Sequence, residues 1–432
     1  MIRALLAAAL ALLTGPAVAD AVTYSGTIGI SEIVVEFSAA PATATLPFAG
    51  RYFYRSNGVD IPLDVVTLGD GNIVLDEEKP CSHVSCKLNE DGTVKQFQLG
   101  ARWEVTASPD GKSVSGTWSE GGRKRPVSLA LVGTSVLPKT GDIGPSALED
   151  TTSDLYFTDP ATKITPATAP YDYLRLQTKL ETTDPINSSG SLYRYVADPR
   201  TRFRFPRIVT LADRSDVGPA NAFLQNDHWE QSLQALDCMA KQYVGFGWNV
   251  DLLDTGGTLG GYQDQRVDVT YLSPEILSWT EVGTFWCGGP HPWPYRRFVN
   301  LDVKSGTELD LSLLFKGWVA TTLDGRAADL VDARTHPQDF IWGPDDALAD
   351  LVKSHLKDPG VHLRDYCDDE SLIDKDYLQI GFEGDDRVQF YIGGDLPAVI
   401  HHCTDILYEA PIAELKDYLT PEAFRYFPSL AK

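Results

Sequence analysis

Short apolar runs separated by turn-forming dipeptides dominate residues 20–135. At five places glycine follows asparagine, aspartate or another glycine, and such pairs tolerate the positive φ angles of tight hairpins. These pairs are Asn57-Gly58, Asp70-Gly71, Asp91-Gly92, Asp110-Gly111 and Gly121-Gly122. The strands expected around them are 33–37, 51–55, 73–75, 97–105, 114–118 and 127–132. The pattern predicts an all-β domain, a meander that closes or nearly closes into a barrel or sandwich.

The pattern changes twice after this region. Residues 136–170 are rich in proline, threonine, serine and aspartate with little apolar periodicity, which predicts a linker. Residues 171–432 then mix helical and strand periods, which predicts an α+β domain. Its expected helices are 219–243, 345–355 and 411–418. Its expected strands are 266–272, 279–286 and 297–303, followed by a hairpin of 377–382 and 387–392.

The helix at 219–243 is the best supported of these elements. Trp229, Leu233, Leu236 and Ala240 recur at spacings of four, three and four, and therefore share one helix face. Pro219 suits the first helical turn, where its missing N–H has no partner in any case.

The first nineteen residues have the form of a signal peptide. Arg3 gives a positive start, residues 5–13 form an apolar stretch, and Ala17-Val18-Ala19 is a small-x-small cleavage site. We therefore expect cleavage after Ala19 and export to the periplasm. The expected division of the chain is 1–19 signal peptide, 20–135 β domain, 136–170 linker and 171–432 α+β domain. No lipobox cysteine lies near the cleavage site, and no later stretch reaches the roughly 18 apolar residues of a membrane helix, so no membrane anchor is expected.

The chain is strongly acidic. It carries 37 Lys and Arg against 60 Asp and Glu, a net charge of −23. Removal of the signal peptide, which holds one Arg and no acid, would make this −24. Such a charge repels nucleic acid and anionic membranes but steers a cationic partner toward the protein. The alternative is that the acidity only keeps an exported protein soluble.

Six cysteines in an exported chain indicate disulfides. They are Cys81, Cys86, Cys238, Cys287, Cys367 and Cys403. Cys81 and Cys86 lie five residues apart and should pair locally. The other four allow three connectivities, and we favour Cys238–Cys287 and Cys367–Cys403 because each pair joins segments close in sequence. No metal site or cofactor is expected, since no C-x-x-C or H-x-x-x-H spacing occurs.

One stretch resembles a known family. It reads Gly288-Gly289-Pro290-His291, then Asn300-Leu301-Asp302, a turn at Gly306, and Leu309-x-Leu311-x-x-Leu314-Phe315. This is similar to the central motif of the extracytoplasmic domains shared by the anti-sigma factor RsiV and the peptidoglycan deacetylase PdaC. The resemblance covers about residues 200–420, with Pro290 departing from the small residue usual after the glycines. It implies an α+β domain with helices packed on an antiparallel sheet.

Candidate binding residues cluster around this motif. They are Trp286, His291, Trp293, Tyr295, Asn300 and Asp302. The aromatic residues could line a groove for a carbohydrate or a protein, or they could belong to the core. His291 could act as a general acid or base, or it could hold a turn.

These residues support expectations about the function of the protein and do not identify a reaction. No complete catalytic motif occurs, which favours a binding protein over an enzyme. The expected partner is a cationic protein such as lysozyme or a cell-wall glycan. The alternatives are a cell-wall-modifying enzyme, with His291 as an acting group, and a structural envelope protein.

Overall fold

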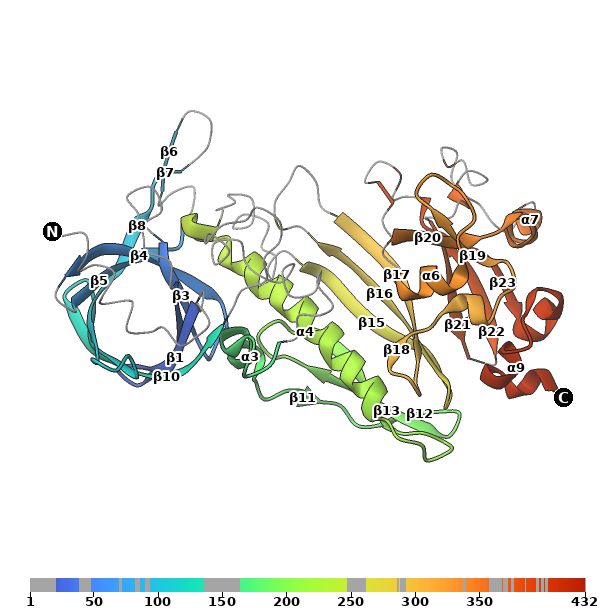
Figure 1. Ribbon diagram of the computed structural model, residues 1–432, viewed down its shortest axis with the longest axis horizontal. Helices are drawn as coiled ribbons and strands as arrows, with labels where there is room; N and C mark the ends of the chain where they lie inside the picture. Colours follow the sequence, from blue (N-terminus) through green and yellow to red (C-terminus); the bar gives the residue numbers. More distant parts are fainter. Residues whose placement is uncertain are drawn as a thin grey trace.

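The computed structural model describes residues 21–38, 48–69, 72–81, 86–89, 94–135, 164–246, 262–285, 287, 293–336, 339–356, 367, 372–373, 377–384, 386–393, 396–397, 400 and 403–431. The expected signal peptide and residues 136–163 of the expected linker lie outside these ranges. A β-barrel lies at one end of an elongated molecule and a small antiparallel sheet at the other (Figure 1).

The β-barrel confirms the predicted all-β meander and shows that, of the barrel and sandwich forms that the sequence left open, the closed barrel is the one formed. Its eight antiparallel strands run in the order β1-β10-β9-β8-β5-β4-β3-β2, and β2 closes against β1. They are β1 (Ala21–Ile28), β2 (Ser31–Ser38), β3 (Phe48–Tyr54), β4 (Asp60–Gly69), β5 (Asn72–Lys79), β8 (Gln98–Ala107), β9 (Ser113–Glu120) and β10 (Arg123–Ser135). The hairpin of β6 (Lys87–Leu88) and β7 (Val94–Gln96) is inserted between β5 and β8 and projects from the barrel (Figure 1).

Aliphatic and aromatic side chains fill the barrel, and the carboxylate of Glu77 lies among them. Tyr52 and Trp103 are fully buried, with ring centroids 5.0 Å apart. The Glu77 carboxylate accepts hydrogen bonds from the indole nitrogens of Trp103 (3.1 Å) and Trp118 (2.8 Å). Burial nevertheless raises the pKa of Glu77.

A buried ionic network fastens helix α3 (Pro170–Leu176) to the outer wall of the barrel. Arg51 contacts Glu36 (2.9 Å), Asp60 (3.1 Å) and Asp172 (3.3 Å). Arg175 contacts Asp60 (3.2 Å) and Asp237 (2.6 Å) and donates to the carbonyl of Gly58 (2.7 Å). Both arginine side chains are fully buried. The network therefore joins the barrel, α3 and the next helix in one water-excluded contact.

The long helix α4 (Gly218–Ala240) connects the barrel to the rest of the molecule (Figure 1). It confirms the predicted helix and ends three residues earlier than expected. Its last turns and the 3-10 turn η4 (Val244–Phe246) join the barrel core through Leu236, Ala240, Tyr243 and Phe246. The expected α+β domain thus contributes side chains to the core of the β domain.

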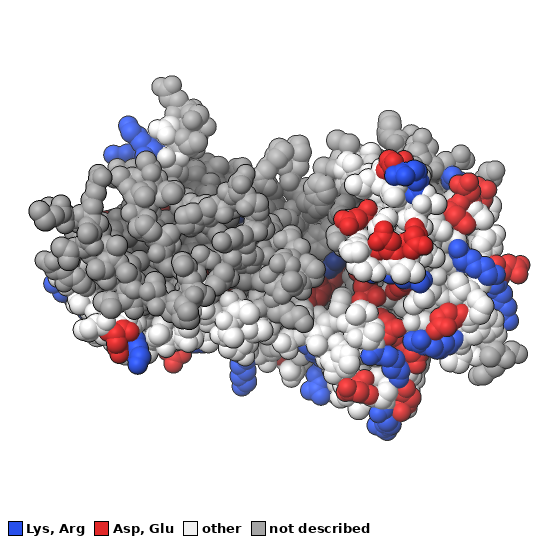
Figure 2. Space-filling view, viewed as in Figure 1, with Lys and Arg blue, Asp and Glu red and all other residues white. Residues whose placement is uncertain are grey.

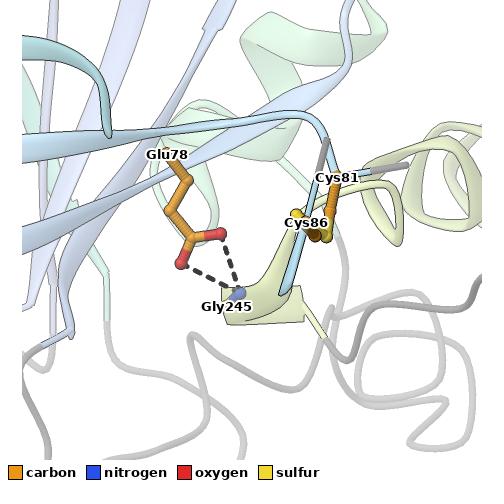
Figure 3. The surroundings of a disulfide bond; sticks show 4 residues. All are labelled: Glu78, Cys81, Cys86 and Gly245. Atoms are coloured by element: carbon orange, nitrogen blue, oxygen red, sulfur yellow. Dashed lines mark hydrogen bonds between the residues drawn. A yellow bond between two sulfur atoms is a disulfide. The ribbon is translucent and has the colours of Figure 1, made fainter. Parts of the chain in front are cut away.

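The end of β5 holds η4 in place. Both carboxylate oxygens of Glu78 accept from the backbone N–H of Gly245, at 3.0 and 3.1 Å (Figure 3). The backbone N–H of Cys81, in the disulfide with Cys86 drawn beside them, donates to the carbonyl of Gln242 at 2.8 Å.

Three further antiparallel sheets follow the barrel. The first contains β11 (Glu181–Thr182), β12 (Ile186–Ser188), β13 (Ser191–Ala197) and β14 (Arg204–Thr210). The second contains β15 (Tyr262–Leu272), β16 (Ile276–Phe285), β17 (Trp293–Asp302) and β18 (Thr307–Glu308). The third contains β21 (Leu378–Glu383), β22 (Arg387–Ile392) and β23 (Asp405–Pro411). One face of β16 and β17 shares a core with α4 and β14, and the other face packs on β21.

Short elements complete the C-terminal half. They are the pair β19 (Trp318–Thr322) and β20 (Phe340–Pro344), the helices α6 (Leu330–Thr335), α7 (Asp346–His355) and α9 (Ala423–Tyr426), and the 3-10 helices η5 (Leu311–Leu313), η8 (Ile412–Tyr418) and η9 (Pro428–Ala431). The mixed architecture agrees with the predicted fold class, and α7 and the β21–β22 hairpin match their predicted positions. The helix expected at 411–418 is a 3-10 helix.

All three disulfides have the expected partners: Cys81–Cys86, Cys238–Cys287 and Cys367–Cys403. Disulfides persist outside the reducing cytoplasm, so they indicate an extracytoplasmic protein. In the described part of the chain, no helix combines the length and the apolar character needed to span a membrane.

Candidate functional site

The structure separates the candidate residues taken from the sequence. Trp286 and His291 lie outside the described residues, and so does the side chain of Trp293. Tyr295 points to the α4 side of β17, where it packs near Phe203 and Ala235. Asn300 and Asp302 lie on the opposite face, because successive strand residues alternate between faces. The described candidates therefore do not form one site.

Asn300 and Asp302 make contacts that hold the fold together. The Asn300 side chain accepts from Ser278 (2.6 Å) and donates to the carbonyl of Ile380 on β21 (2.7 Å). Asp302 accepts from the backbone N–H groups of the turn that follows it and from the Tyr426 hydroxyl (2.7 Å). These bonds connect the second sheet to the third sheet and to α9.

Tyr295 lies beside an ionic cluster between α4 and the second sheet. Glu281 is fully buried and accepts from Gln231 (2.7 Å), Trp279 (2.8 Å) and Arg297 (2.8 Å). Asp227 lies 3.3 Å from the same guanidinium, and burial and the Glu281 charge raise its pKa well above the usual range. Trp279, one of the aromatic residues near the motif, is fully buried and belongs to the core.

A cleft of about 290 Å³ lies between α3 and α4. We call it the α3–α4 cleft, and it is lined by Tyr173, Leu176, Gln177, Thr178, Leu180, Asp198, Gln225, His228, Trp229 and Ser232. The rings of Tyr173 and Trp229 stand perpendicular to each other with centroids 6.3 Å apart. Half-buried aromatic rings beside hydroxyl and amide groups are the usual lining of a small-molecule site.

The sequence held one signal for this cleft. Gln225, His228, Trp229 and Ser232 follow each other at helical spacing and so share one face of α4. The apolar spacing places Trp229 on a face with Leu233 and Leu236, and it predicts no role for the polar residues beside Trp229. The opposite wall of the cleft comes from α3 and the turn after β13. No sequence pattern indicates that these segments lie close to α4.

His228 is one of the residues that line the α3–α4 cleft, and it is only 2% exposed. Its ring stacks on Phe205 with centroids 4.9 Å apart, and its Nδ1 atom lies 3.3 Å from a guanidinium nitrogen of Arg207. Burial, and then the positive charge of Arg207, lower the pKa of His228 to about 3. The imidazole is therefore neutral at physiological pH.

Asp198 is the charged group among the described lining residues, and its charge is already paired. Arg200 contacts both carboxylate oxygens, the shortest distance being 2.6 Å. Because Asp198 binds Arg200 and the Nδ1 atom of His228 faces Arg207, Ser232, His228 and Asp198 do not form a nucleophile–base–acid relay. The arrangement suits binding through hydrogen bonds and ring contacts.

No protein-family model matches the chain, and none of the curated proteins matches it. The resemblance to the domains of RsiV and PdaC therefore stays a prediction. Among the described residues, no three side chains of the metal-binding types gather closely enough to hold a metal ion.

Proposed function

We propose that this protein is an exported binding protein of the cell envelope that holds part of a cell-wall glycan in the α3–α4 cleft. The observation that carries the proposal is the contact of Tyr173 with Trp229 in a cleft that is also lined by polar side chains. Sugar rings have apolar faces that pack on aromatic rings, and hydroxyl groups that need hydrogen-bond partners.

The charge state of the cleft favours a neutral ligand. Asp198 is neutralised by Arg200, and His228 is uncharged. Gln177, Thr178, Gln225 and Ser232 supply neutral donors and acceptors. The volume lies at the lower end of the range for ligand sites, which fits one or two sugar units of a longer chain.

Two independent expectations support a location in the cell envelope. The disulfides indicate an extracytoplasmic protein, and the family resemblance implies a domain that works outside the cytoplasm. Peptidoglycan is the glycan that such a protein meets in a bacterial periplasm.

Calorimetric titration with soluble N-acetylglucosamine oligomers tests the proposal. We expect saturable binding to the full protein, and binding about tenfold or more weaker for Trp229→Ala, because a central aromatic contact carries much of the binding energy. Phe424→Ala, which removes an exposed aromatic side chain on α9, is the matched control and should bind normally. The absence of binding by the wild type, or equal affinity in wild type and Trp229→Ala with unchanged melting temperatures, would overturn the proposal.

A cationic protein such as lysozyme is the second candidate, favoured by the net charge of −23. On the face in Figure 2, acidic and basic side chains lie interspersed over the C-terminal sheets. The attraction would therefore come from the charge of the whole molecule and would weaken with salt. A lysozyme pull-down at low and moderate salt tests this candidate, and no capture at low salt would remove it.

A further inference from the structure

The β-barrel carries a basic hairpin in a molecule that is acidic overall. Arg123, Lys124 and Arg125 form the only run of three consecutive Lys or Arg residues in the sequence. They begin β10, and all three are exposed. The turn before them, Gly121-Gly122, has positive φ angles, and a Cβ atom at either glycine would meet open space. The tip of this hairpin therefore projects into solvent.

A second turn lies against this hairpin and carries an exposed apolar side chain. Gly29, in the turn between β1 and β2, donates its backbone N–H to the carbonyl of Pro126 at 2.8 Å. A Cβ atom at Gly29 would lie 3.5 Å from the side chain of Arg125. The next residue, Ile30, is 98% exposed, the largest fraction among the described large hydrophobic residues. The two turns therefore place an apolar side chain beside the basic run.

The turns around Ile30 carry a local positive charge. They are residues 28–32, 54–58 and 119–125, and the backbone N–H of Arg55 joins the first two by donating to the carbonyl of Glu32 at 3.1 Å. These turns hold four cations and two carboxylates, namely Arg55, Arg123, Lys124 and Arg125 against Glu32 and Glu120. At about 0.1 M salt, exposed charges more than about 10 Å away are largely screened. The net charge of −23 therefore acts only weakly on a surface that touches these turns.

An anionic lipid bilayer fits this combination of cations and an exposed apolar side chain. Its phosphate groups attract Lys and Arg, and each such residue near the surface strengthens binding about fivefold. An apolar side chain beside them can enter the boundary between the headgroups and the acyl chains. A soluble polyanion would contact the cations and leave Ile30 in water, so the isoleucine favours the membrane.

We propose that the β1–β2 and β9–β10 turns dock the protein on an anionic membrane surface. Ile30 enters the headgroup region, and Arg123, Lys124 and Arg125 contact lipid phosphates. One apolar side chain and a short basic run bind weakly, so the protein exchanges between the membrane and solution. This docking does not require a ligand in the α3–α4 cleft.

Co-sedimentation with lipid vesicles at about 0.1 M salt tests this docking. We expect the wild type to bind vesicles of equimolar phosphatidylcholine and phosphatidylglycerol about tenfold or more tightly than vesicles of phosphatidylcholine alone. Arg123→Gln combined with Lys124→Gln should weaken binding to the anionic vesicles about tenfold or more, and Ile30→Ser about threefold or more. Because these three side chains are exposed, the melting temperatures should stay unchanged.

Two exposed positions away from these turns give matched controls. Lys112→Gln removes a cation between β8 and β9, at the opposite end of the barrel, and Leu323→Ser removes an apolar side chain that is 80% exposed. Both variants should bind the anionic vesicles like the wild type. No preference of the wild type for these vesicles, or equal binding by the Arg123 and Lys124 double variant, would overturn the proposal. Unchanged binding by Ile30→Ser would show a contact through charge alone, as with a soluble polyanion, and would also overturn membrane docking.

Discussion

At the scale of single residues, the buried arginines Arg51 and Arg175 should contribute strongly to stability, because they neutralise buried carboxylates of the barrel, α3 and α4. Replacing Arg175 by methionine leaves Asp60 and Asp237 buried without their shared cation. We expect a loss of about 3–5 kcal/mol in the free energy of unfolding, measured by urea denaturation. The control is Arg326→Met, whose partner Asp324 is exposed, and it should change stability by less than about 1 kcal/mol. If Arg175→Met and Arg326→Met lost equal amounts of stability, burial of the ion pairs around Arg175 would not increase their contribution to the free energy of unfolding.

Gly381 makes a second residue-scale prediction. A Cβ atom at this position would lie 2.3 Å from the Phe298 ring, so β21 can approach β17 only because the residue has no side chain. Gly381→Ala should lower the free energy of unfolding by about 1–3 kcal/mol, the usual cost of overpacking a core. Gly384→Ala, where a Cβ meets open space, is the control. A stable Gly381→Ala protein would mean that the two sheets can separate freely.

At the scale of elements, the buried carboxyl group of Glu78, which contacts η4, should make the stability of the fold depend on pH. Burial raises the pKa of Glu78 from its ordinary 4.5 to about 7. The folded state therefore favours the protonated form, so the Glu78 contribution is complete below pH 4.5 and is lost as the pH rises to 7. This amounts to about 3 kcal/mol, since one pKa unit corresponds to about 1.4 kcal/mol.

Glu78→Gln keeps an acceptor for Gly245 and removes the titration. Urea denaturation from pH 4.5 to 8 should show a smaller decline in stability for this variant than for the wild type. Glu36, whose pKa burial also raises to about 7, should continue to contribute to the decline in both proteins. Parallel curves for the two proteins would contradict the assignment to Glu78.

Several elements could be predicted from the sequence because their signals are local. The helical spacing of Trp229, Leu233 and Leu236 predicted α4, and the turn-forming dipeptides predicted where most barrel strands lie. β1 and β4 were missed, since β1 is rich in small polar residues and β4 contains a proline and a register shift between Val65 and Thr67.

The candidate site could not be predicted in the same way, because its contacts join distant segments. The cleft pairs Tyr173 with Trp229, and the joint beside it pairs Tyr171 with Asp60, which are 111 residues apart. Helical spacing shows that residues share a face, but it does not identify the segment that covers this face. The stretch that resembles the RsiV and PdaC domains predicted a site on β17, where alternation separates Tyr295 from Asn300.

At the scale of the whole molecule, the three disulfides should stabilise the folded state by different amounts. In the chain-entropy view, a disulfide stabilises more when it closes a longer loop. Replacing both cysteines by serine should therefore cost about 2 kcal/mol for Cys81–Cys86, which are five residues apart, and about 4 kcal/mol for the other two pairs, which are 36 and 49 residues apart. Thermal unfolding of the three double variants gives the order, and a largest loss at Cys81–Cys86 would contradict it.

The buried ionic network that joins the barrel to α3 and α4 has a practical consequence. Arg51 and Asp172 belong to segments separated by 121 positions, and the end of α4 fills part of the barrel core. These noncovalent contacts should hold the barrel on the remaining chain even after a peptide bond within residues 136–163 is cut. A protein whose chain is cut within those residues should therefore stay together as one particle when it is separated by size under native conditions. The barrel and the remaining chain, produced as separate fragments, form a natural pair for complementation.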